Sequence, residues 1–387
     1  MRKLLPARLL PSLALVFVLA QAASAQAPAP ALPPVDMRHA LSALPDAQGV
    51  LFVNVRRLVN EVLPKLLPPS QYQKMLTEAK QVGFDARGVE YAAAAVRFTD
   101  PAPANGLPEF VVVIRGNFNA DTLLSLGRVV AGAQNVKTRS ETYGGKTLEI
   151  IDLEALNKLK EGADPNAAAA DGGEGSKPKP MPYPEVAVVA LDASTLVAGV
   201  PAYVRAAVDA SGGQGGLKAS MIDLAAHDPQ ALWSLTAELP PSTADYLHRA
   251  GVPASQEADE MIAWVKQFSF AQGMDALNYT TSASVLTDSP EHASAFSGLI
   301  RMGLLAAQTA LSREAAKKTG KDAQQARTAL AALKTFVNRT EGNTLHLSFA
   351  VPQRALNALI RSELMEKTRP APTTSAKPTR RGRARRR

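Results

Sequence analysis

The 387 residues of the sequence include no cysteine. Disulfide bonds, thiol nucleophiles and cysteine-based metal sites are therefore excluded. A bacterial lipoprotein is excluded as well, because its lipid is attached to a cysteine at the cleavage site. Hydrophobic residues make up 46% of the chain, an ordinary share for a globular protein, so the packing of apolar side chains must hold the fold together.

Motifs of catalytic chemistry are also missing. The chain has neither a G-x-S-x-G elbow nor an S-x-x-K motif paired with K-T-G. The adjacent acids Asp259 and Glu260 would point to different faces of a helix. The histidines lie far apart and lack metal-binding spacing: His39, His227, His248, His292 and His346. We therefore predict no enzyme, no cofactor and no metal site, although a site assembled from distant residues stays open.

Residues 140–147 read SETYGGKT and end like a phosphate-binding loop. That motif needs a glycine at the position that Ser140 occupies, and it joins a strand to a helix. Here the segments on both sides favour strands. The pattern therefore predicts a tight hairpin turn at 143–146 and no bound nucleotide.

The N-terminus has the three parts of an export signal. Three basic residues precede an apolar run over 9–20, and Ala23 and Ala25 supply the small residues of a cleavage site. The run is well short of the roughly 20 residues that span a bilayer. We expect residues 1–25 to be a signal peptide removed after Ala25, and the protein to reach the periplasm or cell envelope, with secretion open.

Positive charge is concentrated at the two ends. The net charge is +8, but removing the three basic residues of the signal and the eight of residues 368–387 leaves 32 basic against 35 acidic residues. This balance gives no reason to expect a nucleic-acid groove. The C-terminal tail is predicted to be disordered in isolation. Six of its arginines are candidates for binding an anionic surface: Arg380, Arg381, Arg383, Arg385, Arg386 and Arg387.

Strand and helix patterns alternate through the rest of the chain and predict an α+β fold with mainly antiparallel sheets. The clearest strand is 109–115, and a long helix is expected over 290–317. The predicted segments are an Ala/Pro-rich linker at 26–36, a first lobe at 37–211 with a disordered insert at 161–184, a second lobe at 217–367, and the basic tail at 368–387.

The order of these elements predicts two pseudo-repeated lobes. Each half contains strands, a capped helix and a hairpin, and closes with a strand, a Val-Pro pair and an apolar helix. The closing units read VPAYVRAAVDA at 200–210 and VPQRALNALIR at 351–361. The alternative is that Val-Pro recurs by chance in a proline-rich chain.

Residues 296–307 are apolar around most of a helix circumference, which predicts burial on more than one side. One interpretation is a core helix between a sheet and a second helix. The other is a wall of a cavity for a lipid-like ligand.

The layout resembles families of uncharacterised exported bacterial proteins of the domain-of-unknown-function type. The residues that carry this resemblance are Leu44-Pro45-Asp46-Ala47 with 50–55, and Val200-Pro201-Ala202. It covers about 37–366 and implies a fold and a location, without an activity.

The first functional hypothesis is therefore a non-catalytic envelope protein that binds or scaffolds. Its tail would tether it to an anionic component such as lipid, lipopolysaccharide or another polyanion. The alternatives are a periplasmic carrier of an apolar ligand and an enzyme whose site is not visible in the sequence. The oligomeric state stays open.

Overall fold

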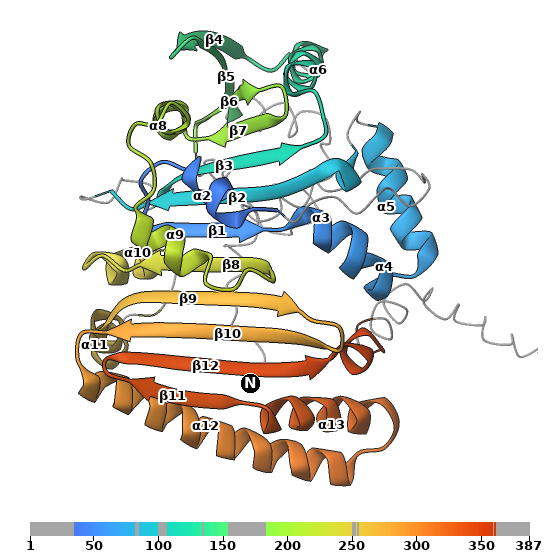
Figure 1. The fold of residues 1–387 in the computed structure, drawn as a ribbon, viewed down its shortest axis with the longest axis vertical. Helices are drawn as coiled ribbons and strands as arrows, with labels where there is room; N and C mark the ends of the chain where they lie inside the picture. Colours follow the sequence, from blue (N-terminus) through green and yellow to red (C-terminus); the bar gives the residue numbers. More distant parts are fainter. Residues whose placement is uncertain are drawn as a thin grey trace, which may run out of the picture.

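The computed structural model describes residues 35–81, 85–99, 107–133, 135–153, 183–249, 253, 255–358 and 360. Helices pack on one large antiparallel sheet, which confirms the predicted α+β class (Figure 1). The expected signal peptide, nearly all of the linker, most of the insert and the basic tail lie outside the described residues.

The sheet has twelve strands in the order β11-β12-β10-β9-β8-β1-β2-β3-β7-β6-β5-β4. Neighbouring strands run antiparallel throughout. Their bounds are β1 Gly49–Val53, β2 Val89–Arg97, β3 Glu109–Gly116, β4 Thr138–Tyr143, β5 Lys146–Asp152, β6 Glu185–Asp192, β7 Thr195–Gly199, β8 Ala231–Glu238, β9 Val265–Met274, β10 Asn278–Thr287, β11 Val337–Glu341 and β12 Thr344–Pro352.

The helices connect these strands and pack on both sides of the sheet. Their bounds are α2 Met37–Ser42, α3 Val55–Arg57, the π-helical turn η1 Leu58–Val62, α4 Leu63–Leu66, α5 Pro69–Gln81, the 3-10 turn η2 Ala86–Gly88, α6 Ala120–Ala133, α8 Pro201–Ser211, α9 Ala219–Ala225, α10 Thr243–Arg249, α11 Gln256–Trp264, α12 Pro290–Lys317 and α13 Gly320–Lys334. The long helix expected over 290–317 is confirmed as α12. Residues 353–358 are also helical.

The two halves of the chain meet in the centre of the sheet, where β1 pairs with β8. Leu51 lies opposite Leu235 and Phe52 lies opposite Ser234 across this pair. The described strands of both halves therefore belong to a single sheet. We call the side that carries Phe52 and Ser234 face A, and the side that carries Leu51 and Leu235 face B.

Face A changes character along the sheet. One row of neighbouring residues on it reads Ser348, Ser282, Ala271, Ser234, Phe52, Ala93, Val113, Val197, Val189 and Leu148. The apolar end of this row lies in the main core, which α2, α8 and α9 complete. The serine end lies on strands of the second half, where Ser282 is half-buried and Ser348 is exposed.

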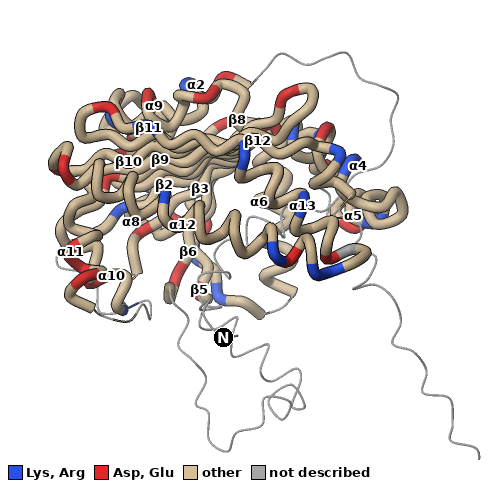
Figure 2. Tube along the Cα trace, turned by 90° about the horizontal axis from the view of Figure 1, so that it is seen from below, with Lys and Arg blue, Asp and Glu red and all other residues tan. Residues whose placement is uncertain are grey.

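Face B is apolar in both halves. Its central row includes Leu347, Ala283, Phe270, Leu235, Leu51, Ala94, Val112, Ala198 and Val188. In the first half, α3 to α5 pack a second core against it around Val59, Tyr72 and Leu76. In the second half α12 packs on this side, because Ser297 donates a 2.9 Å hydrogen bond to Asn338 of β11. Figure 2 shows α2 and α9 on the opposite side of the strands from α12.

The predicted turn at 143–146 is confirmed, since β4 and β5 form a hairpin there. Gly144 and Gly145 have φ angles of 55° and 73°, which other residues rarely adopt. At the end of the expected insert, Tyr183 lies within the described residues, where it packs edge-on against Phe110 and donates to the Pro108 carbonyl at 2.6 Å. Burial raises the pKa of Tyr183 to about 12.

A substitution at Phe52 tests whether the two halves unfold together. Phe52 is 1% exposed in the first half, and both tryptophans lie in the second. Because the sheet is continuous, Phe52→Ala should lower the free energy of unfolding, measured by tryptophan fluorescence in urea, by about 3–5 kcal/mol. An unchanged fluorescence transition beside a shifted circular dichroism transition would contradict a single cooperative sheet.

Candidate functional site

The middle of α12 exposes a stripe of large apolar side chains. Leu299, Met302 and Leu305 are 46%, 62% and 64% exposed. They lie three residues apart and so share one side of the helix. The long apolar helix was expected to be buried on more than one side, and for these three residues that expectation is wrong. A helical period shows which residues are apolar but not whether a neighbour covers them.

The N-terminal end of α12 is held firmly, so the stripe has a fixed position. Ser289 caps the helix by accepting a hydrogen bond from the His292 amide, and Pro290 follows at the first helical position. The His292 ring stacks flat on Trp264 of α11, with 4.0 Å between centroids, and pairs with Asp288. Trp264 also packs edge-on against Phe296.

Helix α6 carries a similar exposed stripe. Leu126, Val129 and Val130 are 42%, 69% and 47% exposed. Helix α6 follows β3, and α12 follows β10. Counted outward from the β1–β8 junction, with β1 and β8 as the first strands, β3 and β10 are each the third strand on their own side. Asn119 caps α6 by accepting a 2.8 Å hydrogen bond from the Thr122 amide.

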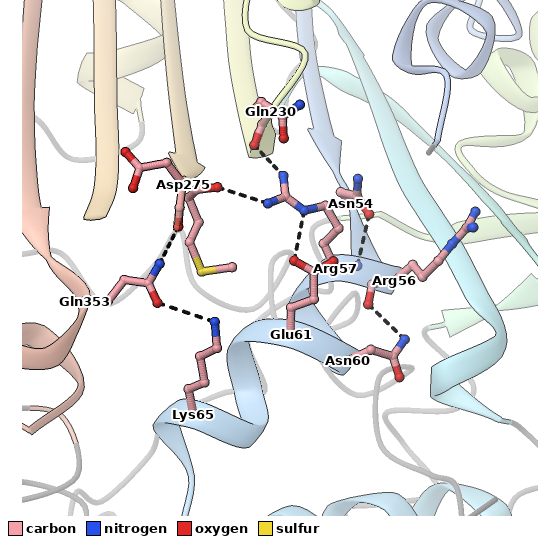
Figure 3. Close-up of polar contacts among 10 residues, drawn as sticks. Asn54, Arg56, Arg57, Asn60, Glu61, Lys65, Gln230, Asp275 and Gln353 are labelled. Carbon is pink, nitrogen blue, oxygen red and sulfur yellow. Dashed lines mark hydrogen bonds and ion pairs between the residues drawn. The ribbon is translucent and has the colours of Figure 1, made fainter. Parts of the chain in front are cut away.

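A polar clasp joins the first-half helices to the strand ends of the second half (Figure 3). Arg57 donates to the backbone carbonyls of Gln230 at 2.6 Å and Met274 at 3.1 Å. Its Nε donates to Glu61, one turn along the same helix, at 3.3 Å. The Arg57 side chain is only 19% exposed, so these bonds are largely shielded from water.

The clasp extends to the C-terminal segment. Lys65 donates to the Gln353 side chain at 3.4 Å, and Gln353 donates to the Asp275 carbonyl. Both contacts appear in Figure 3 beside the π-helical turn that separates α3 from α4. The partners of Arg57 and Gln353 are backbone carbonyls and neighbouring side chains. We therefore interpret the clasp as a structural contact that holds the two halves together.

The five histidines remain apart in the fold. His39 lies on α2, His248 pairs with Asp259 at 2.9 Å, and His292 pairs with Asp288. His227 contacts Ser282 on face A at 3.2 Å, and His346 lines a 170 Å³ pocket there. Within the described ranges, no group of three or more His, Asp or Glu could hold a metal ion.

The Gly-Lys-Thr segment lines a polar pocket of 280 Å³. Gly145, Lys146 and Thr147 form one wall, and residues of α6 and of the β6–β7 turn form the others. Lys146 donates a 2.7 Å hydrogen bond to the Leu191 carbonyl. Both this pocket and the face A pocket lie away from residues 296–307.

The six tail arginines predicted to contact a partner lie outside the described residues. They are Arg380, Arg381, Arg383, Arg385, Arg386 and Arg387. The apolar pattern at 296–307 indicates the helix that carries the α12 stripe, but the α6 stripe was not expected. The apolar run LLSLGRVV at 123–130 is the signal that points to it. No helix in the described segments is long and apolar enough to cross a membrane.

Comparisons with known proteins give little. No family model and no curated protein matches the chain. Crystal form III of TP0453 aligns with a TM-score of 0.39 and 9% identity, covering 86% of this chain and 99% of that one. Crystal form IV aligns at 0.40 and 9%, over 85% and 97%. Likeness at this level establishes neither a shared fold nor a shared function.

Replacement of Arg57 tests the clasp. Arg57→Met leaves two shielded carbonyls without their charged donor, so the free energy of unfolding should fall by about 2–3 kcal/mol in urea. Arg38→Met is the control, because Arg38 and Asp223 form a surface pair with side chains 60% and 63% exposed. Such pairs contribute less than about 1 kcal/mol. Equal losses in the two variants would contradict a clasp.

The contact that anchors α12 should depend on pH. The hydrogen bond from His292 holds the pKa of Asp288 below its ordinary value. A carboxyl with a lowered pKa contributes stability above its unfolded pKa of about 3.9 and loses it as pH falls through the folded value. Between about pH 5 and pH 2, unfolding free energy should therefore fall more steeply in the wild type than in Asp288→Asn.

His292→Leu removes the donor and should flatten the pH dependence in the same way. An Asp288→Asn variant as steep as the wild type in urea titrations at each pH would show that this pair does not contribute.

Proposed function

We propose that this protein is an exported, non-catalytic envelope protein that docks on an anionic lipid surface. The exposed apolar stripe of α12, formed by Leu299, Met302 and Leu305, is the observation that carries the proposal. An apolar patch on an anchored helix, open to water, is a typical site of protein or membrane contact. We favour lipid because the chain also ends in a strongly basic segment.

Charge supports the same partner. Arg301 lies beside the stripe and is exposed, and Arg313 follows it two turns after Leu305. In the described part of the chain, positive and negative residues are otherwise dispersed (Figure 2). The tail arginines would add about 1 kcal/mol each near an anionic leaflet at low salt. An apolar stripe with a separate basic tether gives the two signals that stable peripheral binding requires.

The proposal includes an internal duplication of the fold. Counting outward from the centre, the first half orders its strands β1-β2-β3-β7-β6 and the second half β8-β9-β10-β12-β11. In each half the helix that bears an exposed stripe follows the third strand of this order, and a Val-Pro helix follows the fourth. This correspondence supports two pseudo-repeated units that share one sheet.

Carriage of an apolar ligand is a weaker candidate. It calls for a cavity beside residues 296–307, whereas the large apolar side chains there face water and the two described pockets lie elsewhere. An enzyme would need converging reactive groups, whereas His248 and His292 pair with different carboxylates, Asp259 and Asp288, and His227 contacts Ser282. Surface docking needs neither feature.

Sedimentation with lipid vesicles tests the docking. Mature protein from Gln26 should bind vesicles that contain anionic phosphatidylglycerol and bind neutral phosphatidylcholine vesicles less. Replacing Leu299, Met302 and Leu305 together with serine should weaken binding at least tenfold at both low and high salt, because the lost contact is apolar. Val337→Ser is the matched control, since Val337 is 55% exposed on β11, outside the stripe.

Deletion of residues 377–387 separates the two contributions. It should abolish the extra binding to anionic vesicles at low salt and leave the salt-insensitive part. If the triple serine variant binds like the wild type, the α12 stripe is not the docking surface. If the deletion has no effect at any salt concentration, the tether is wrong.

A further inference from the structure

The polar pocket beside α6 is built from three separate parts of the first half. Helix α6 supplies Asp121, Leu124 and Arg128, the β4–β5 hairpin supplies residues 145–147, and the β6–β7 turn supplies residues 190–193. The Ala120 amide donates to the Ala193 carbonyl at 2.8 Å, which ties the start of α6 to that turn. With 280 Å³, the pocket has room for a compact molecule.

The charges of this pocket are separated along α6. Asp121 lies in the first turn and Arg128 lies two turns later on the same side, about 10 Å along the axis. Asp192 stands on the β6–β7 turn, which is tied to the acidic end of α6. The pocket therefore has an acidic end at Asp121 and Asp192 and a basic end at Arg128. The Lys146 ammonium is bonded to the Leu191 carbonyl, next to Asp192.

The basic end is fixed in place. Arg128 pairs at 2.9 Å with Glu149, whose side chain is only 7% exposed. Glu149 also accepts hydrogen bonds from Ser140 at 2.9 and 3.0 Å. Arg128 itself remains 49% exposed, so its guanidinium has both a buried anchor and a solvent-facing side. At the other end, the Ser194 amide and the Ser194 and Thr195 hydroxyls hold the Asp192 carboxylate, and Arg115 approaches it to 3.8 Å.

We propose that this pocket binds a compact zwitterion, with its acidic group at Arg128 and its ammonium group at Asp121 and Asp192. A simple anion would be attracted to the basic end but repelled by the two aspartates. A simple cation would be attracted to the aspartates but repelled by the basic end. A ligand that carries both charges gains at both ends. This inference is independent of the proposed docking through α12.

The probe is O-phosphoethanolamine, with inorganic phosphate and ethanolamine as its two halves. Isothermal titration calorimetry of the full mature chain should show the probe binding at least tenfold more tightly than either half. Phosphate that binds as tightly as the probe would make this an anion site and overturn the proposal. Absence of probe binding at concentrations up to about 10 mM, a range that includes weak ligands, would also overturn the proposal.

Variants assign the two ends. Asp121→Asn should weaken probe binding at least fivefold and leave the affinity for phosphate unchanged or higher. Arg128→Lys should weaken both, because a lysine paired with Glu149 does not present the planar, multiple donors of a guanidinium to the ligand. Lysine is used because removing the cation altogether would leave buried Glu149 without its charged partner. Asp223→Asn, an exposed acid on α9, is the control and should change neither affinity. Probe binding unaffected by both pocket variants would refute the assignment.

The same zwitterion occurs free and as the headgroup of phosphatidylethanolamine. A competition experiment distinguishes these sources. The probe is first bound to the variant in which Leu299, Met302 and Leu305 are serine, and vesicles of phosphatidylethanolamine and phosphatidylcholine are then added. Displacement of the probe identifies the headgroup as the ligand, and undisturbed binding identifies the free compound. Because the free-probe titration needs no vesicles, failure of the α12 docking would leave it intact.

Discussion

The pairing of β1 with β8 is the constraint on which the rest of the structure depends. These strands come from opposite halves of the chain, and their register determines which side chains share a face across the twelve strands. Successive residues of a strand point to opposite sides, so a slip of one residue would exchange the faces of one half. Phe52 would then lie with the residues that now surround Leu235, and the core under α2 would lose its continuity.

This register also explains why the two halves use their faces differently. Face A is apolar in the first half, where helices cover it, and serine-rich in the second half. The apolar residues of the second half are therefore concentrated on face B, where α12 packs. A helix that packs with one side on a sheet leaves its other side open, and on α12 that side is apolar. The Arg57 clasp then fixes how the first-half helices meet the second-half strands.

Local structure could be predicted from the sequence more completely than contacts between distant segments. The bounds of α12 follow from Ser289, Pro290 and the apolar period, and the Gly144-Gly145 hairpin follows from turn chemistry. Helices α2 and α9 have six and seven residues, too few for a period to be distinct. The β1–β8 pair joins residues that are at least 180 positions apart, which no local pattern reveals. The exposure of Leu305 and the assembly of the Asp121–Arg128 pocket likewise depend on contacts between segments that lie apart in the chain.

The terminal strands of this sheet have a consequence for how the protein meets its own copies. A sheet whose outer strands keep backbone groups unpaired offers a template for further strands. Here Arg139 and Glu141 stand on β4, and Arg339 and Glu341 stand on β11, all ion-paired within the chain. A foreign strand added at either border would have to strip water from these charges. The charged edge strands β4 and β11 thus disfavour pairing with strands of other molecules and oppose fibre growth.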